Sequence, residues 1–249
     1  MAQKIRVGAV SYLNTKPLIY GFEKGLLADE ISLLFDYPSN IARGLLDNSI
    51  DIGLVPVAVI PALSHPHILP GYGIATDGEV ASVALFSDVP LEEIQTILLD
   101  YQSRTSVALL KLLLQKYWKI NPRLEPAGAG YEETIGGTTA GLVIGDRALV
   151  QRRRSVYIFD LGSAWKDMTG LPFVFAAWVS NRPFDPGFEK RFSDAVAEGL
   201  QQLDAVIAQN PFAWYDLHTY YTQNISYPLD AAKMKGLELF LSYLRQTAP

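Results

Sequence analysis

The chain has 249 residues, of which 49% are hydrophobic and 19% charged, so it can bury a sizeable core and is unlike a disordered protein. A formal net charge of -5 argues against general nucleic-acid binding, and the absence of cysteine excludes disulfides, iron–sulfur clusters and thiolate zinc sites. No segment is long and apolar enough to span a membrane, and the first residues run into a strand without an apolar signal region. We therefore expect a cytoplasmic protein that does not bind membranes.

Strands and helices alternate along most of the chain. The apolar runs predict strands near residues 7–10, 31–35, 51–55, 80–86, 96–99, 142–145, 156–159 and 173–179. Helices are expected after residues 17, 38, 56 and 106, and in C-terminal segments near 187–209, 211–222 and 229–246. This alternation is typical of βαβ units and predicts mostly parallel sheets.

The pattern restarts after about residue 90, which indicates two α/β lobes followed by C-terminal helices. We expect the chain to cross between the lobes near 87–90 and again near 170–172. The first lobe would then comprise residues 1–88 and 173–249, and the second lobe residues 89–172. Such an arrangement places a cleft between the lobes, where small ligands usually bind.

The turn after the first strand is the first candidate site. It presents the polar side chains of Ser11, Tyr12, Asn14 and Thr15, and Pro17 stands where a helix would begin. Ligands of open α/β folds bind at the carboxyl ends of strands, and a helix N-terminus adds backbone N–H donors there. The turn therefore predicts a binding site at this strand–helix junction.

A second cluster of donors precedes the apolar run that starts at Val107. Ser103, Arg104, Thr105 and Ser106 supply three hydroxyls and a guanidinium at a helix start, which suits an anionic ligand. An ordinary helix cap needs only one of those hydroxyls, so we favour ligand binding over capping. Asn40 is a weaker candidate of the same kind, because a simple cap is the favoured explanation for Ser39 and Asn40.

Other polar residues have simpler explanations from the sequence. Ser82 interrupts an apolar strand and lacks the surroundings of a serine hydrolase nucleophile. Asp146 follows a strand and precedes a helical pattern, so a helix N-cap explains it. His65 and His67 flank a proline in what is expected to be a surface loop, without metal-ligand companions at helical spacing. No metal and no cofactor are implied.

Several separated motifs together resemble the menaquinone-biosynthesis family of the futalosine pathway, and within it the dehydratase branch. The likeness runs from about residue 5 to the C-terminal helices, in the family's order. The matching segments are Ser11–Asn14 with Pro17, Asp51–Pro56, Ser103–Ser106, Ile144–Asp146, and Trp165 with Thr169–Phe175. The sister branch that makes 1,4-dihydroxy-6-naphthoate has a cysteine-containing turn near its N-terminus, which this chain lacks.

The resemblance implies a fold like the type II periplasmic binding proteins, with two α/β lobes around a cleft. It implies a lyase that removes water from chorismate to give 3-[(1-carboxyvinyl)oxy]benzoate, with Asn14 and Ser82 as the functional polar residues. Ser11, Tyr12, Thr15, Asn40 and Ser103–Ser106 are then candidates for substrate binding. Because no side chain in these clusters is an evident base, we expect the enolpyruvyl carboxylate of the substrate to take the proton.

Two other functions remain open at this point. The chain could be the sister enzyme of the same pathway, which acts on cyclic dehypoxanthine futalosine, or a solute-binding protein that closes on an anion without chemistry. Product analysis separates the first of these from the dehydratase, and ligand binding without turnover would identify the second. The sequence leaves the oligomeric state undetermined.

Overall fold

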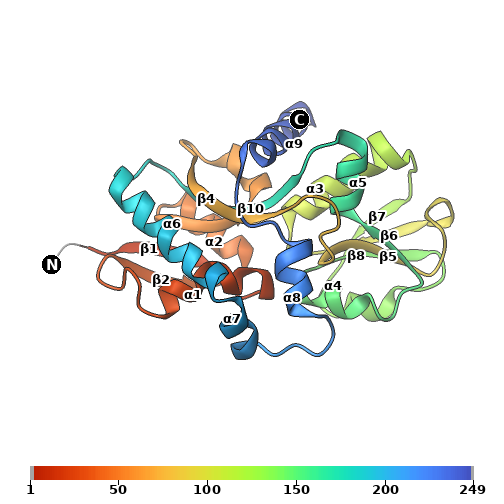
Figure 1. The fold of residues 1–249 in the computed structure, drawn as a ribbon. Coiled ribbons are helices and arrows are strands. Elements are labelled where there is room, and N and C mark those ends of the chain that lie inside the picture. The colour runs from red at the N-terminus through yellow and green to blue at the C-terminus, as the bar shows by residue number, and fades with distance from the viewer. Residues whose placement is uncertain (1–2, 248–249) are drawn as a thin grey trace.

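The computed structural model describes residues 3–247, which form two α/β lobes lying side by side (Figure 1). Each lobe is built on a five-stranded sheet. The first sheet has the order β2-β1-β3-β10-β4, with β1 (Ile5–Ala9), β2 (Ile31–Phe35), β3 (Ile52–Pro56), β4 (His67–Thr76) and β10 (Phe173–Ser180). The second sheet has the order β7-β6-β8-β5-β9, with β5 (Val83–Ser87), β6 (Thr96–Leu99), β7 (Arg123–Pro126), β8 (Thr139–Ile144) and β9 (Tyr157–Asp160).

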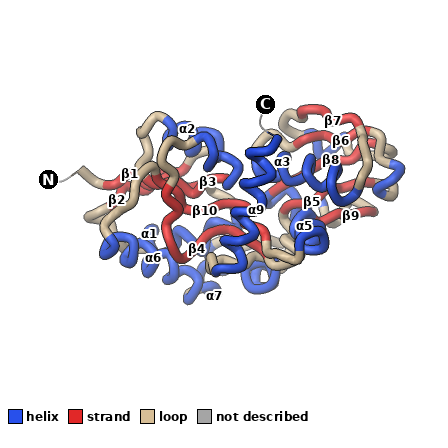
Figure 2. Tube along the Cα trace, turned by 90° about the horizontal axis from the view of Figure 1, so that it is seen from above, coloured by secondary structure: helices blue, strands red, loops and turns tan. Residues whose placement is uncertain are grey.

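Helices flank both sheets (Figure 2). The first lobe has the short 3₁₀ turns η1 (Leu13–Thr15) and η2 (Val57–Ala62) and the helices α1 (Lys16–Glu23) and α2 (Pro38–Leu46). The second lobe has α3 (Arg104–Leu113), continued by the π turn η4 (Leu114–Trp118), then α4 (Gly145–Gln151), α5 (Leu161–Thr169) and the 3₁₀ turns η3 (Leu91–Glu93) and η5 (Tyr131–Thr134). The C-terminal part has α6 (Pro186–Gln201), α7 (Leu203–Gln209), α8 (Leu217–Thr219) leading into the π turn η6 (Tyr220–Asn224), and α9 (Ala231–Thr247).

Local sequence signals account for several helix starts. Proline occupies the first turn of α1, α2 and α6, where a missing N–H leaves no hydrogen bond unmade. Asp185 caps α6 by accepting hydrogen bonds from the backbone N–H groups of Gly187 and Phe188. Ser103 caps α3 in the same way through the N–H of Ser106. The proline of α1 and the Ser103 cap of α3 explain why helices begin at the two candidate sites that the sequence indicates.

The sheets are less parallel than expected. β1 runs parallel to β2 and β3, and β6 runs parallel to β7 and β8. β10 is antiparallel to both of its neighbours, β3 and β4, and β5 is antiparallel to β8 and β9. β5 and β10 are the strands that follow the two crossings between lobes, so each antiparallel strand enters its sheet from the other lobe.

The first crossing lies earlier than the sequence predicted. The strand Val83–Ser87, which a boundary at residue 88 would assign to the first lobe, belongs to the second sheet. The chain therefore leaves the first sheet after Thr76 and crosses in residues 77–82. The chain returns to the first sheet between α5 and β10, at residues 170–172. An apolar strand carries no signal for which of two sheets it joins, and this is why the boundary was misplaced.

Two strands and one loop differ from expectation. β4 was not predicted, because Pro70 and two glycines interrupt its apolar pattern; it is an edge strand with register shifts against β10, where such residues are tolerated. Its first residue is His67, which was expected in a loop. β7 is another edge strand and was also missed. Residues 211–216, expected to be helical, are not.

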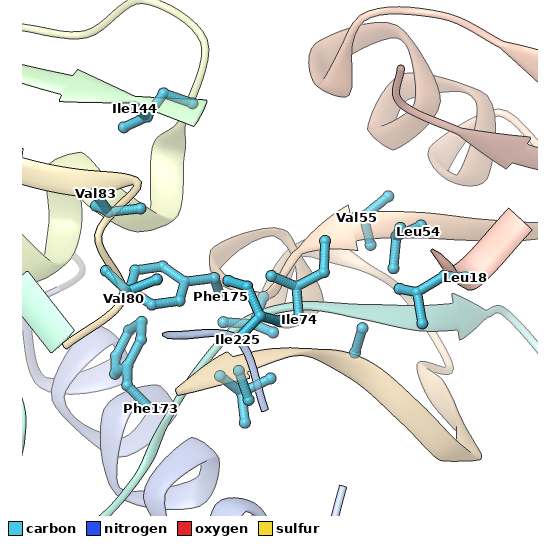
Figure 3. Close-up of a cluster of buried hydrophobic side chains, with 14 of the residues drawn as sticks. Leu18, Leu54, Val55, Ile74, Val80, Val83, Ile144, Phe173, Phe175 and Ile225 are labelled. Atoms are coloured by element: carbon cyan, nitrogen blue, oxygen red, sulfur yellow. The ribbon is translucent and has the colours of Figure 1, made fainter. Parts of the chain in front are cut away.

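A buried hydrophobic core runs through both lobes and across the region between them. Figure 3 shows part of it, with Phe173 and Phe175 of β10 close to Val80 and Val83 from the crossing and β5. Trp165 of α5 packs edge-on against Phe173, which ties the second lobe to β10 of the first. Among the described residues, no helix is long and apolar enough to cross a membrane.

Candidate active site

A cavity lies between the lobes, at the carboxyl ends of β1, β3 and β8. Five apolar side chains form much of its wall: Leu54, Ile74, Val83, Ile144 and Phe175. Figure 3 shows Val83 and Ile144 on the second lobe and the other three on the first. The polar lining residues are Tyr12, Asn14, Gln102, Ser103 and Ser106, and the remaining ones are Val10, Pro38, Pro56, Gly145 and Ala176. All of these lining residues are uncharged.

The starts of several helices converge on this cavity. Asn14 lies in η1 immediately before α1, and Pro38 is the first residue of α2. Ser103 is the N-cap of α3, and Gly145 is the first residue of α4. Backbone N–H groups at helix starts lack intrahelical partners and carry the positive end of the helix dipole. An apolar cavity with several such starts can bind an anion without a cationic side chain.

The Ser103 and Ser106 side chains are arranged as hydrogen-bond donors. The Ser103 hydroxyl accepts a 3.1 Å hydrogen bond from the Ser106 N–H and donates a 2.9 Å bond to the Ser106 hydroxyl oxygen. The hydrogen of the Ser106 hydroxyl is then free to bind an acceptor in the cavity. Both functions considered for this cluster, helix capping and ligand binding, are therefore available, because Ser103 caps the helix and Ser106 lines the cavity.

Asn14 and Ser82 are brought together, although they come from different segments. Asn14 lines the cavity, and its backbone carbonyl accepts a 3.0 Å hydrogen bond from the Tyr227 hydroxyl. Ser82 is buried directly before the lining residue Val83. The Tyr220 hydroxyl lies close to both: burial raises its pKa, and interactions with Ser82 and Asn14 lower it. None of these contacts gives Tyr220 a hydrogen bond of good geometry within the described residues.

The other predicted binding residues are used differently. Thr15 is fully buried, and the Thr105 hydroxyl accepts a 3.0 Å hydrogen bond from the Ala58 N–H. Asn40 donates a 2.8 Å bond to Asp36 and does not line the cavity. Ser11 and Arg104 are exposed at two adjoining openings of the same cleft. The expected group of binding residues therefore divides into cavity lining, cleft mouth and structural contacts.

Sequence reasoning missed a charged network beside the cavity. The Arg147 guanidinium donates to Asp100 at 2.6 Å and to the Gln102 side-chain oxygen at 3.0 Å, and it also pairs with Glu132. Burial alone would lower the pKa of Arg147, but Asp100 and Glu132 raise it, so the guanidinium stays cationic. The same Gln102 oxygen accepts a 2.5 Å hydrogen bond from the Tyr12 hydroxyl of the other lobe. These residues are scattered along the chain, so no local motif signals them.

Asp146 does not cap its helix as expected. α4 begins one residue earlier, at Gly145, and the Asp146 carboxylate accepts a 3.1 Å hydrogen bond from the Leu13 N–H in the first lobe. Burial raises the pKa of this carboxyl, and the Leu13 N–H opposes the rise. The sequence could not predict this contact, because it joins residues 133 positions apart.

Comparisons with known proteins agree with this architecture. A chorismate dehydratase of Thermus thermophilus is 31% identical over 264 aligned positions, which cover 96% of this chain and 94% of that protein. A crystal structure of an Archaeoglobus fulgidus protein has a TM-score of 0.72 at 16% identity, covering 98% of this chain and 97% of that one. The periplasmic aliphatic sulphonate binding protein SsuA of Escherichia coli has a TM-score of 0.61 at 15% identity, covering 100% of this chain and 95% of that one.

The structural likenesses confirm the expected fold, which is that of the periplasmic binding proteins. The profile of the family described as menaquinone biosynthesis matches residues 5–246, nearly the whole chain. The chain therefore belongs to the menaquinone-biosynthesis family.

Proposed function

We propose that this protein is a hydro-lyase that removes water from chorismate to give 3-[(1-carboxyvinyl)oxy]benzoate. The observation that carries the proposal is the relationship, over 96% of the chain, to a protein named chorismate dehydratase. The turn Ser11–Asn14 supports the same branch of the family, since it lacks the cysteine expected of the sister enzyme.

The cavity suits the proposed substrate. Chorismate is a dianion with a largely apolar ring, and the cavity combines an apolar wall with several helix starts. The free hydrogen of the Ser106 hydroxyl and the backbone N–H groups of α3 are donors for a carboxylate. Because the lining is uncharged, preorganised dipoles would stabilise that carboxylate, and such dipoles act strongly where water is excluded.

The reaction needs a proton taken from one ring carbon and a hydroxyl lost from its neighbour. The proton is vinylogous to the ring carboxylate, so donors that stabilise this carboxylate as charge flows into it acidify the proton. The enolpyruvyl carboxylate of the substrate takes the proton, and the neighbouring C–O bond then breaks. Proton and hydroxide together make the released water, and the ring becomes aromatic, which drives the reaction.

In this proposal Asn14 acts from the cavity wall and orients the leaving hydroxyl. Ser82, which precedes the wall residue Val83 in the sequence, donates a hydrogen bond to a substrate carboxylate. The Tyr227 hydroxyl holds the Asn14 backbone and so supports the position of its side chain. Localisation in the cytoplasm is part of the same proposal.

Mass spectrometry of the purified, metal-free protein incubated with chorismate tests the proposal. We expect an aromatic product lighter than chorismate by one water, formed at the same rate with and without a chelator. Asn40→Ala is a matched control for Asn14→Ala, because Asn40 binds Asp36 outside the cavity. Chorismate that decays only at its spontaneous rate would contradict the proposal. Turnover of cyclic dehypoxanthine futalosine would then identify the sister enzyme, and tight binding of chorismate without turnover would identify an anion-binding protein.

A further inference from the structure

Asp146 at the start of α4 in the second lobe binds Leu13 of the Asn14 turn in the first lobe, and the next residue, Arg147, is linked to Tyr12 of that turn through Gln102. The Asp146 carboxylate accepts the Leu13 N–H at 3.1 Å. Arg147 donates to Gln102 at 3.0 Å, and Gln102 in turn accepts the Tyr12 hydroxyl at 2.5 Å. The second lobe therefore binds the Tyr12–Leu13 pair at both its side chain and its backbone.

Gly145, which precedes these two residues, lets the contact form. Its φ of +63° lies in the left-handed region, which favours glycine. A Cβ atom at this position would be in ordinary van der Waals contact with the Tyr12 ring, at 3.5 Å, so it is the backbone conformation that favours glycine here. The Gly145 N–H donates a 2.8 Å hydrogen bond to the Ser82 carbonyl, so the same residue is fixed to the end of the first crossing. Gly145, Asp146 and Arg147 thus meet the turn as one unit.

Asn14 is the next residue after Leu13 and is held from two sides. Asp146 binds the N–H of Leu13 on one side, and the Tyr227 hydroxyl binds the carbonyl of Asn14 on the other. The Asn14 side chain has a long contact, 3.4 Å, with the Thr15 hydroxyl, and the Tyr220 hydroxyl of η6 lies near it without a hydrogen bond of good geometry within the described residues. Its position at the cavity therefore depends largely on the backbone of the turn, and of the two backbone bonds the one to Asp146 comes from the second lobe.

The groups around Asp146 fit a hydrogen-bond acceptor better than a partner in an ion pair. Lys16 and Arg147 attract the carboxylate from nearby, but it forms no ion pair within 4.0 Å among the described residues. Tyr220 and Tyr221 face it from η6, and their hydroxyls have no hydrogen-bond partner of good geometry in the described part of the chain. The N–H of Leu13 is thus the principal hydrogen bond of this carboxylate.

We propose that Asp146 is a positioning residue for the reaction, which accepts the Leu13 N–H as the lobes close and so sets the Asn14 side chain at the cavity. This inference rests on the proposed function, since it gives Asn14 its catalytic setting. When the lobes separate, water can replace both partners of the bond, so the contact belongs to closure rather than to the folding of either lobe. Asn14 then reaches its working position only in the closed protein.

Two substitutions of Asp146 separate this role from a chemical one. Asp146→Asn removes the charge but keeps a side-chain oxygen that accepts the Leu13 N–H. Asp146→Ala removes the acceptor. The exposed Asp167→Ala on α5 controls for the loss of one carboxylate. Steady-state kinetics with chorismate are combined with hydrogen exchange at the Leu13 amide, measured by NMR, and with thermal melting as a check of folding.

We expect Asp146→Ala to lower kcat by about 10- to 100-fold, more than it raises KM, and to speed exchange at Leu13 by a similar factor. Asp146→Asn is expected to stay within a few-fold of the unmodified protein in both readouts. Normal turnover and protected Leu13 in Asp146→Ala would overturn the inference. So would an Asp146→Asn variant that is inactive while Leu13 stays protected, because the carboxylate would then act on the proton itself. If the unmodified protein leaves chorismate unchanged, the proposed function fails, and the Leu13 exchange still decides whether Asp146 holds the turn.

Discussion

The hydroxyl of Tyr12 donates a 2.5 Å hydrogen bond to the side-chain oxygen of Gln102, and this bond joins the two lobes across the mouth of the cavity. Burial, the largest influence, raises the pKa of Tyr12 to about 12, so the hydroxyl is a donor at neutral pH. The same oxygen accepts a hydrogen bond from Arg147, which is itself held by Asp100. One amide oxygen therefore links the first lobe to the charged network of the second.

Tyr12→Phe removes this donor and keeps the ring against Gly145. Because a neutral hydrogen bond contributes about 1 kcal/mol, we expect the closed state to weaken and the KM for chorismate to rise by about fivefold. Stability should change little, because the Gln102 oxygen keeps its bond from Arg147. Steady-state kinetics and thermal melting check this, with the exposed Tyr117→Phe as control. An unchanged KM would mean that the bond does not contribute to closure.

Most elements of the fold follow from local sequence. The strand Ile31–Phe35 has the predicted ends and the helix Pro38–Leu46 starts where predicted, because an apolar run and a proline at a helix start are both local signals. The choice of sheet for Val83–Ser87 depends on which partner strand it meets, and nothing inside the strand records that. The edge strand β4 was missed because a proline and two glycines interrupt its apolar pattern, and an edge position with register shifts tolerates such residues.

The candidate site was predictable only where a motif is continuous in the chain. The turn at Tyr12 and Asn14 and the helix start at Ser103 and Ser106 were found, and all four residues line the cavity. Gln102 was missed, since it lies one residue before the donor cluster and the partners of its side-chain oxygen, Tyr12 and Arg147, come from two distant segments. Thr105 lies inside the predicted donor motif but does not line the cavity, and its hydroxyl instead accepts a hydrogen bond from the backbone N–H of Ala58 in the other lobe.

The roles proposed for Asn14 and Ser82 predict a loss of turnover without a loss of folding. Removing one donor that stabilises developing charge costs about 100- to 1000-fold in kcat, and we expect Ser82→Ala to fall in that range. Its hydroxyl has a long 3.5 Å contact with the Val80 carbonyl and no hydrogen bond of good geometry with the nearby Tyr220 hydroxyl, so the melting temperature should be nearly unchanged. Asn14→Ala is expected to lower kcat by a similar factor. Near-normal turnover in either variant would remove that residue from the mechanism.

Arg147 is expected to stabilise the second lobe through Asp100. The Asp100 side chain is 0% exposed, so Arg147→Met leaves a buried carboxylate without its cation. Removing one partner of a buried pair costs about 3 kcal/mol of the free energy of unfolding, measured by urea denaturation. Arg154→Met is the matched control, because Arg154 and Glu133 are 50% and 73% exposed, and exposed pairs contribute roughly 0 to 1 kcal/mol.

The double variant Arg147→Met with Asp100→Asn completes this test. Removing both charges eliminates the unpaired carboxylate, so the double variant should be more stable than Arg147→Met alone. Equal stability of the two variants would show that Arg147 acts through Glu132 or Gln102 instead of Asp100.

Because the buried Asp160 carboxylate binds the first crossing, we expect the stability of the protein to depend on its protonation and therefore on pH. It accepts hydrogen bonds from the N–H groups of Val80 at 3.1 Å and Ala81 at 2.9 Å, and it caps α5 through Ser163. Burial nevertheless raises its pKa from 3.8 to about 6. Between these two values the folded protein binds more protons at this residue than the unfolded chain does. Its contribution to the free energy of unfolding is therefore complete at about pH 4 and is lost as the pH rises through about 6.

The comparison of the unmodified protein with Asp160→Asn isolates this effect from the other carboxyl groups. A shift of about two pKa units corresponds to about 3 kcal/mol, so the stability difference between the two proteins should move by up to that amount between pH 4 and pH 7. As the pH rises, the unmodified protein should lose stability relative to Asp160→Asn. Urea denaturation across this range measures it, with Asp204→Asn, exposed on α7, as control for the lost charge. A difference that stays constant with pH would mean that the three backbone N–H groups outweigh burial and keep Asp160 ionised.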